Sequence, residues 1–539
     1  MSEELIRVLF LNAPFNMNDQ RFRLSRLSIG QQAIASNLGD HISVMMRDAS
    51  QMTREELRDL LSSWQPHHVG VTLYEHLLAE TKELLAFIKE CSPSILTSIG
   101  GPMATLSPKV SLAHCRPDFL FMGEAEKTFG EMLSIVGTDP HFRSSSSAIA
   151  ALWEVEGLCL LDSRGGLIAN TKKPRFSSSE LDELPLRLEL AAQMIGESTY
   201  HLNSSRGCPY QCIFCSKVHG SRYRSWSADR TVKTVAEIAS LSESGRLPHI
   251  EKIIFHDDDF FIDRKRTLSI LKSLAGARHQ FTYMFQSNIA SFFRGGEIDT
   301  EVLDALSALK VGNIRLGTES LNHDELVRLH KPCTDVRQIM ELTEELHRRG
   351  IQSVHYLILS NPWTTAKDLL ESMFNATEMM LRFGCLFTIN PYIAPVYGSP
   401  FYDRLIRENI PFSGRMIKAD GKPELDYRIG AIHHIFDLLV RRTVLDVQER
   451  RCRNPLFTNE NPSIYLSLLK KHLDREKKRR SEGAGDMQYD FDEVDRYWKT
   501  RRKAFEELRS EMAGKNGMSY RFLSSSAVTD FADRQTGSK

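Results

Sequence analysis

Residues 204–215 read SSRGCPYQCIFC and place three cysteines within eight residues: Cys208, Cys212 and Cys215. Thiolates at the spacing C-x3-C-x2-C on one loop can hold three irons of a cubane iron–sulfur cluster. The fourth iron then has no cysteine nearby and can bind a ligand from outside the protein. Two other interpretations are a zinc knuckle completed by His201 or His219, and three unrelated cysteines. The Arg-Gly lead-in and the pattern of the downstream sequence favour the cluster.

Length and composition limit the class of protein. The chain of 539 residues is long enough for two or three domains with substantial cores. Lys plus Arg and Asp plus Glu both number 69, so the net charge gives no reason to expect a nucleic acid or a membrane surface as partner. No apolar run approaches the roughly 20 residues of a membrane span, and the acidic start is unlike a signal peptide. Nine cysteines, three of them clustered, do not resemble a secreted disulfide framework. We expect a cytoplasmic protein.

Strand and helix signals alternate over residues 1–138. Apolar runs predict five strands, at 5–11, 41–46, 69–73, 95–99 and 119–121. Helical patterns lie between them, for example at 30–38 and 78–90. This alternation predicts an α/β fold with a doubly wound, mostly parallel sheet. Residues 139–195 contain serine runs and a hairpin-like piece with its turn at 164–166, which predicts an interdomain linker.

Six further strand–helix units follow in residues 196–410. The predicted strands lie at 200–204, 252–256, 281–286, 313–317, 354–359 and 386–392. The helical patterns lie at 230–242, 264–274, 300–309, 335–348 and 366–382. This series predicts a partial (β/α)6 barrel with its site at the carboxyl ends of the strands. For residues 411–539 we expect a helical C-terminal region, with helices at 425–450, 462–480 and 490–512 and a disordered tail.

The cysteine motif, with Phe214 before its third cysteine, resembles that of the radical S-adenosylmethionine (SAM) enzymes. The resemblance implies that the open iron chelates SAM, and that one electron from the cluster cleaves SAM to a 5′-deoxyadenosyl radical. Three strand ends are similar to SAM-contacting segments of the family: FHDDDF at 255–260, QSN at 286–288 and LGTES at 316–320. The residues implied to bind SAM are Phe214, Asp257, Asp258, Ser287 and Glu319. An alternative role for the aspartates is to cap the helix that begins at Arg264.

The N-terminal domain resembles the cobalamin-binding domain that precedes the radical core in one large class of these enzymes. The matching pieces are IGGPMA at 99–104 and MGEAE at 122–126. Glycines at a strand end let the backbone approach a ligand closely, as the nucleotide tail of cobalamin would require. The residues implied to bind cobalamin are Thr72, Gly100, Gly101, Gly123 and Glu124. Leu27 stands where many cobalamin domains have a histidine that coordinates cobalt. We therefore expect the lower face of a bound cobalamin to have no histidine ligand from the protein. The alternative is a domain that has kept its fold and lost the cofactor.

The resemblance implies a class B, cobalamin-dependent radical SAM methyltransferase. It would act on an unactivated carbon, or a phosphinate phosphorus, of a small intermediate in natural product biosynthesis. The implied cofactors are a 4Fe-4S cluster, SAM and cobalamin, and the implied partner is an electron donor such as flavodoxin or ferredoxin. An alternative keeps the radical but gives a rearrangement, cyclisation, oxidation or epimerisation without methyl transfer. A third hypothesis is a degenerate cluster protein that binds ligands or transfers electrons.

Overall fold

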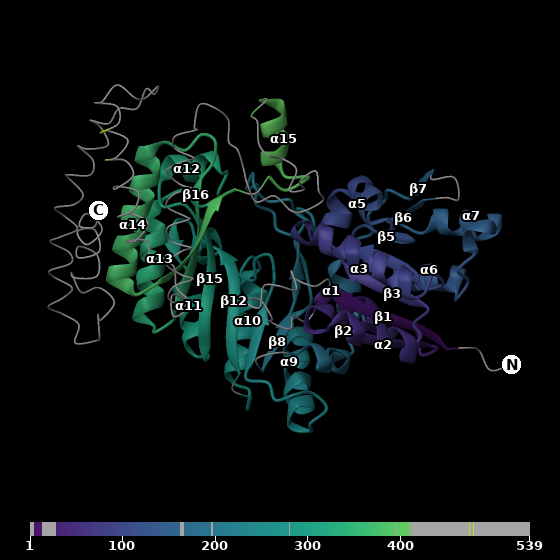
Figure 1. Cartoon of the computed structure of the whole chain (residues 1–539). Coiled ribbons are helices and arrows are strands. Elements are labelled where there is room, and N and C mark those ends of the chain that lie inside the picture. The colour runs from purple at the N-terminus through teal and green to yellow at the C-terminus, as the bar shows by residue number, and fades with distance from the viewer. Residues whose placement is uncertain are drawn as a thin grey trace, which may run out of the picture.

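The computed structural model describes residues 5–12, 28–161, 166–195, 198–279, 281–393, 395–408 and 410, together with positions 474 and 478. Figure 1 shows two α/β domains side by side, with the N-terminal domain in purple and blue and the second domain in teal and green. Leu27 and the three helices predicted in the C-terminal region lie outside the described residues, apart from positions 474 and 478.

The first domain is built on a seven-stranded sheet in the order β2-β1-β3-β4-β5-β6-β7. Five strands pair in parallel: β1 (Ile6–Asn12), β2 (Ile42–Asp48), β3 (His68–Thr72), β4 (Leu96–Gly100) and β5 (Phe119–Phe121). These strands are largely buried apolar runs, as parallel strands covered on both faces require. The helices are α1 (Ile29–Ser36), α2 (Arg54–Trp64), α3 (Leu78–Cys91), α4 (Pro102–Leu106), α5 (Pro108–Cys115) and α6 (Thr128–Val136). The predicted parallel sheet is confirmed.

The segment between the two domains is itself structured. After α7 (Ser146–Glu154), strands β6 (Leu158–Leu161) and β7 (Leu167–Ala169) form an antiparallel hairpin. β6 pairs with β5, so the hairpin extends the first sheet. The short helix α8 (Ser178–Glu183) and the 3-10 helix η5 (Leu188–Met194) then lead to the second domain.

The second domain contains six parallel strands in the order β17-β16-β15-β12-β11-β8. Their bounds are β8 (Thr199–Leu202), β11 (Lys252–Phe255), β12 (Thr282–Asn288), β15 (Val311–Glu319), β16 (Ser353–Ser360) and β17 (Leu386–Tyr392). The main helices are α9 (Ala228–Glu243), α10 (Arg264–Ala275), α11 (Thr300–Ser307), α12 (His323–Arg328), α13 (Val336–Arg348), α14 (Ala366–Phe383) and α15 (Pro400–Arg407). The predicted partial barrel is confirmed.

The two domains share one hydrophobic core. A continuous cluster of buried side chains extends from Val8 and Phe10 in the first sheet to Leu357 in the second. Tyr200 of β8 is fully buried in it, and its hydroxyl accepts a hydrogen bond from Gln32 Nε2 of α1 at 2.7 Å. The carboxyl ends of both sheets therefore keep a fixed relation to each other. None of the helices in the described ranges is long and apolar enough to cross a membrane.

Candidate active site

The clustered cysteines lie on the loop between two short paired strands, β9 (Ser205–Arg206) and β10 (Arg224–Ser225). Gly207 opens this loop with a left-handed φ of 85°. A Cβ at Gly207 would lie only 2.3 Å from the carbonyl oxygen of Arg222, so no other residue fits without a backbone shift. Asp258, beyond the end of β11, accepts a hydrogen bond from Gly207 N at 2.7 Å. Glycine geometry and this carboxylate together fix the path of the chain into the cysteine loop.

The three thiols lie in an environment that disfavours unpartnered thiolates. Cys212 is buried, and Cys208 and Cys215 are partly buried. Burial raises the pKa of Cys208 to about 12 and also raises the pKa values of Cys212 and Cys215. Thiolate ligands on this loop therefore need a strongly bound cation, which the irons of a cluster supply.

The histidines that a zinc site would recruit have other partners. His201 Nδ1 lies 2.7 Å from His256 Nε2, and His219 Nδ1 lies 3.2 Å from Asp258 Oδ2. Among the described residues, no three His, Cys, Asp or Glu side chains converge as ligands of one metal ion do. A cluster does not require such convergence, because each cysteine binds a different iron. The residues of this loop fit the cluster.

Glu319 ends β15 next to a buried lysine. Its φ of 66° is left-handed, which is uncommon for a residue other than glycine. Glu319 Oε1 lies 3.8 Å from Lys331 Nζ, and the two side chains are 12% and 3% exposed. Burial raises the pKa of Glu319, although Lys331 opposes the shift. A Cβ at Gly317 would lie 3.1 Å from Glu319 Oε1, so glycine keeps this space open. A strained backbone and a buried charge at a strand end are typical of a functional position.

Phe214 connects the cysteine loop to Glu319 and Lys331. Lys331 Nζ lies 5.9 Å from the centroid of the Phe214 ring, within range of a cation–π interaction. The neighbouring Ile213 donates its N–H to Leu329 O at 3.1 Å and accepts a hydrogen bond from Phe401 N at 2.8 Å. The structure therefore brings Phe214 and Glu319, two of the residues predicted to bind SAM, together with the cysteine loop.

The other three residues predicted to bind SAM differ in their surroundings. Asp257 is fully buried and accepts hydrogen bonds from Ser204 Oγ at 3.0 and 3.2 Å. Ser287 is buried and donates to Asp259 Oδ1 at 2.6 Å. Asp258 has a 40% exposed side chain and lines a cavity. Contact with SAM stays a prediction for all three. The helix-capping role belongs to Asp263, whose side chain accepts from Arg266 N at 3.0 Å.

The cavity that Asp258 lines has a volume of about 1090 Å³ and extends from the carboxyl end of the first sheet to Cys215. Thr72, Ser98 and Gly100 line it on the side of the first domain. Ser98 Oγ is buried without a hydrogen-bond partner, as expected where a polar ligand binds. A Cβ at Gly100 would have nothing closer than 3.8 Å, so this wall is open. These features fit a large polar cofactor between the domains, as cobalamin is.

Two glycines predicted to bind cobalamin are required by the fold itself. Gly101 has a φ of 97°, and a Cβ there would lie 2.8 Å from Thr72 Cγ2. Gly123 has a φ of 76°, and a Cβ there would lie 2.9 Å from Pro174 O. Both also line the cavity. Their conformation explains why they are glycines, and contact with cobalamin stays a prediction.

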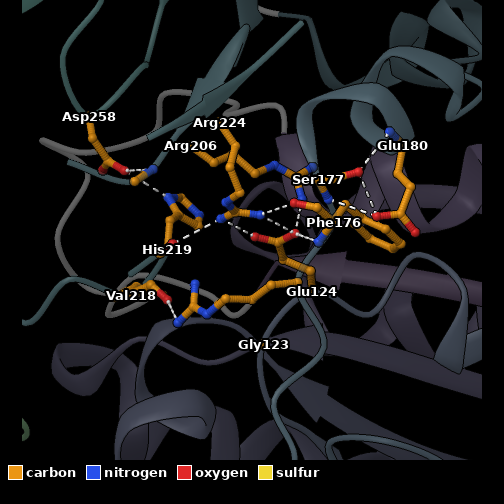
Figure 2. A network of polar contacts seen from close by, with 12 residues as sticks. Gly123, Glu124, Phe176, Ser177, Glu180, Arg206, Val218, His219, Arg224 and Asp258 are labelled. Carbon is orange, nitrogen blue, oxygen red and sulfur yellow. Dashed lines mark hydrogen bonds and ion pairs between the residues drawn. The ribbon is translucent and has the colours of Figure 1, made fainter. Parts of the chain in front are cut away.

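Glu124, also predicted to bind cobalamin, makes a buried ion pair with the second domain. Figure 2 shows its carboxylate facing Arg224, with Oε1–Nη2 and Oε2–Nη1 distances of 2.7 and 2.9 Å. Phe176 N also donates to Glu124 Oε2, at 2.9 Å. Burial would raise the pKa of Glu124, but the hydrogen bonds from Arg224 and the charge of Arg206 outweigh it and hold the pKa below its usual value. Glu124 lines the cavity, and its contact with cobalamin stays a prediction.

Arg206, two residues before the first cysteine, extends this network. Its Nη1 lies 3.3 Å from Glu124 Oε2, and its Nη2 lies 2.5 Å from Glu126 Oε1. Arg224 also donates to His219 O at 2.9 Å, at the far end of the cysteine loop. The sequence reasoning missed both arginines as partners of the glutamates. The acidic pair in GEAE and the Arg-Gly lead-in were visible, but nothing in the sequence connects two segments 80 residues apart.

Comparison with known proteins agrees with this geometry. Residues 202–374 match the model of the Radical SAM superfamily. The chain is 21% identical over 377 residues to an uncharacterized methyltransferase of Pyrococcus horikoshii. The match covers 68% of this chain and 76% of the relative. It is 22% identical over 353 residues to an anaerobic magnesium-protoporphyrin IX monomethyl ester cyclase of Rubrivivax gelatinosus, covering 64% of this chain and 58% of the relative.

Among solved structures, the cobalamin-dependent S-adenosylmethionine radical enzyme OxsB, with aqua-cobalamin and S-adenosylmethionine bound, is similar with a TM-score of 0.68. The match covers 95% of this chain and 81% of that one at 14% identity, so it shows a shared fold. The matched residues contain the cysteine loop near their start, so residues 202–374 of this chain form a radical SAM core.

Proposed function

We propose that this enzyme is a cobalamin-dependent methyltransferase that acts on an unactivated carbon, or a phosphinate phosphorus, of a small biosynthetic intermediate. The observation that carries the proposal is the cavity lined by both domains, from Thr72 and Ser98 to Cys215 and Asp258. A methyl donor held by the first domain and a radical formed at the cysteine loop can act on one substrate only if they face the same space. The relative named a methyltransferase supports methyl transfer as the outcome.

The residues of this chain would bind and orient the reacting groups. When bound, the cluster supplies the electron that cleaves SAM, and cobalamin supplies the methyl group. Cys208, Cys212 and Cys215 would hold the cluster. Glu319 is held by Lys331, so its carboxylate would be in place to accept hydrogen bonds from SAM without reorganisation. We further propose that a flavodoxin or ferredoxin delivers the electron.

A second candidate function has its own support. The relative from Rubrivivax gelatinosus is named a cyclase, and this chain matches 58% of its length. A radical formed in the same cavity could close a ring instead of accepting a methyl group. The residues that hold the cluster and SAM would be the same for both reactions, so the products must distinguish them.

The test is anaerobic reconstitution with iron, sulfide and cobalamin, followed by a chemical reductant and SAM that carries a labelled methyl group. We expect label to be recovered with cobalamin, together with S-adenosylhomocysteine, before any substrate is added. With substrate, each turnover should give one S-adenosylhomocysteine and one 5′-deoxyadenosine, with label in the product. Formation of 5′-deoxyadenosine while the label stays in SAM and methionine, with none in cobalamin or product, would favour the cyclase type of reaction. A protein that cannot take up cobalamin would contradict the proposed function.

A further inference from the structure

Arg315 is a positively charged side chain in the cavity that has no acidic partner. It lies on β15, is partly buried and lines the cavity. Across the described ranges of the chain, no carboxylate forms an ion pair with it. Arg206, the other arginine in the lining, contrasts with it because Arg206 is paired with Glu124 and Glu126. A guanidinium withdrawn from bulk water is stabilised by an anionic partner, which for Arg315 would have to be a ligand.

The strand register places Arg315 in a row of polar side chains. Its neighbours in β15, Ile314 and Leu316, are fully buried, so Arg315 points to the opposite face of the sheet, toward the cavity. Arg315 pairs with Gln286 of β12. Continuing the registers of β11 with β12 and with β8 places His256 and Asn203 at the same level. These two residues directly follow β11 and β8, and both line the cavity. The hydrogen bond from His256 N to Leu202 O, at 2.7 Å, keeps the two segments paired beyond the strands.

An imidazole pair lies at one end of this row. His256 Nε2 is 2.7 Å from His201 Nδ1, and the two rings are stacked with centroids 5.0 Å apart. Both histidines line the cavity. Neither the row nor His201 contributes a carboxylate, so this part of the wall carries a guanidinium, imidazoles and amides. Such a wall favours an anionic ligand over a cationic one.

Arg315 lies deeper in the barrel than Glu319, one of the residues expected to bind SAM. It precedes Glu319 by four residues on the same strand, which corresponds to about 13 Å at 3.3 Å per residue. The cysteine loop follows β8 and Glu319 ends β15, so both lie at the carboxyl ends of the strands. An anion bound to Arg315 is therefore distinct from the group of SAM that Glu319 would bind.

We propose that Arg315 binds an anionic group of the substrate, either a carboxylate or a phosphoryl group, beside His201 and His256. The planar guanidinium matches both groups with two parallel hydrogen bonds. An anion held at this depth would leave the other end of the substrate near the strand ends, where the reacting groups are expected. The inference rests on the proposed function only in taking the cavity as the substrate site.

The test measures chemical modification of single arginines by phenylglyoxal, read by peptide mass spectrometry. The sample is the full chain with its cluster and cobalamin reconstituted and with SAM bound, and reference samples omit SAM, cobalamin or both. Inorganic phosphate and acetate are added in separate arms, with chloride at equal ionic strength as the reference. We expect phosphate, acetate or both to slow the modification of Arg315 by about threefold or more. Arg337, which is 91% exposed on α13, is the internal control and should react equally in all arms.

Two outcomes of the modification experiment would overturn the proposal. The first is an equal rate of Arg315 modification in phosphate, acetate and chloride. The second is complete protection of Arg315 by SAM or cobalamin alone, because the anion would then belong to that molecule. Protection by phosphate alone indicates a phosphoryl group, and protection by acetate alone indicates a carboxylate; both support the proposal.

A variant gives an independent check. Arg315→Met should keep the cluster, the affinity for SAM and the melting temperature. The anion that protects Arg315 should raise the melting temperature of the wild type but not of the variant. A lower melting temperature or weaker SAM binding in Arg315→Met would assign Arg315 to the fold or to SAM instead. None of these measurements needs methyl transfer. Absence of label from cobalamin and product would therefore contradict the proposed function and leave this inference standing.

Discussion

Replacing Glu124 with glutamine should loosen the contact between the two domains. Glu124 and Arg224 have side chains that are only 4% and 5% exposed. Removing one member of such a pair leaves a buried charge without compensation, which costs about 3–5 kcal/mol. Arg224 keeps its hydrogen bonds to Phe176 O and His219 O, and Arg206 keeps Glu126. We therefore expect the lower end of the range, about 3 kcal/mol.

Amide hydrogen exchange measures this loss locally. Peptides that cover 119–126 and 205–225 should lose about two decades of protection in Glu124→Gln, because about 1.4 kcal/mol corresponds to a factor of ten. The matched control is Glu156→Gln, which removes an ion pair with Lys172 that is 73% exposed on the lysine side. Exposed pairs contribute about 0–1 kcal/mol, so this control should change protection little.

The double variant Glu124→Gln/Arg224→Gln completes the cycle. It should be less destabilised than the sum of the two single variants, because neither partner then leaves a charge behind. The reasoning is refuted if Glu124→Gln costs no more than Glu156→Gln. It is equally refuted if the two single effects simply add.

Three further predictions follow from the site. Alanine at Cys208, Cys212 or Cys215 should abolish iron retention and 5′-deoxyadenosine formation. Alanine at the buried Cys385 is the control and should change neither. A full cluster in any of the first three variants would contradict the assignment. Glu319→Gln should keep the cluster but weaken SAM binding by about 1.5–3 kcal/mol in equilibrium titrations. Glu341→Gln, at an exposed position, is the control. Unchanged affinity for SAM would show that Glu319 has a structural role instead. Because folding lowers the pKa of Glu124, the ionised carboxylate should stabilise the folded state fully at any pH above its ordinary pKa of 4.5. This contribution should disappear as the pH falls through the lower pKa of the folded state. Hydrogen exchange at 119–126 that does not change with acid would argue against this.

The strands of both sheets were predictable because their signals are local. Parallel strands covered on both faces are short apolar runs bounded by turns, and β17 was predicted with its observed bounds, Leu386–Tyr392. The cysteine loop was predictable for the same reason, since all three thiols lie within eight residues. The hairpin of the linker was also predictable. Its addition to the first sheet was not predictable, because it depends on pairing with β5, a strand more than 30 residues earlier in the chain.

The surroundings of the polar residues could not be read from the sequence. Asp257 and Asp258 are adjacent, yet one is fully buried against Ser204 and the other lines the cavity. β11 ends at Phe255, so strand alternation no longer fixes where the two aspartates point. The Glu124–Arg224 pair joins residues 100 positions apart, and only the packing of the two domains brings them together.

The contact between Gln32 and Tyr200 has a consequence for domain exchange between relatives. The sequence suggests two modules that could be recombined at residue 138 or residue 196. The fold does not allow such a simple exchange, because α1 is hydrogen-bonded both to β8 and to the linker. Gln32 of α1 bonds to Tyr200 of β8, and Ser36 Oγ accepts a hydrogen bond from Arg187 N at 2.8 Å. A chimera that takes its first domain from another enzyme should therefore carry the matching segment through β8, or it would leave polar groups buried without partners at the junction.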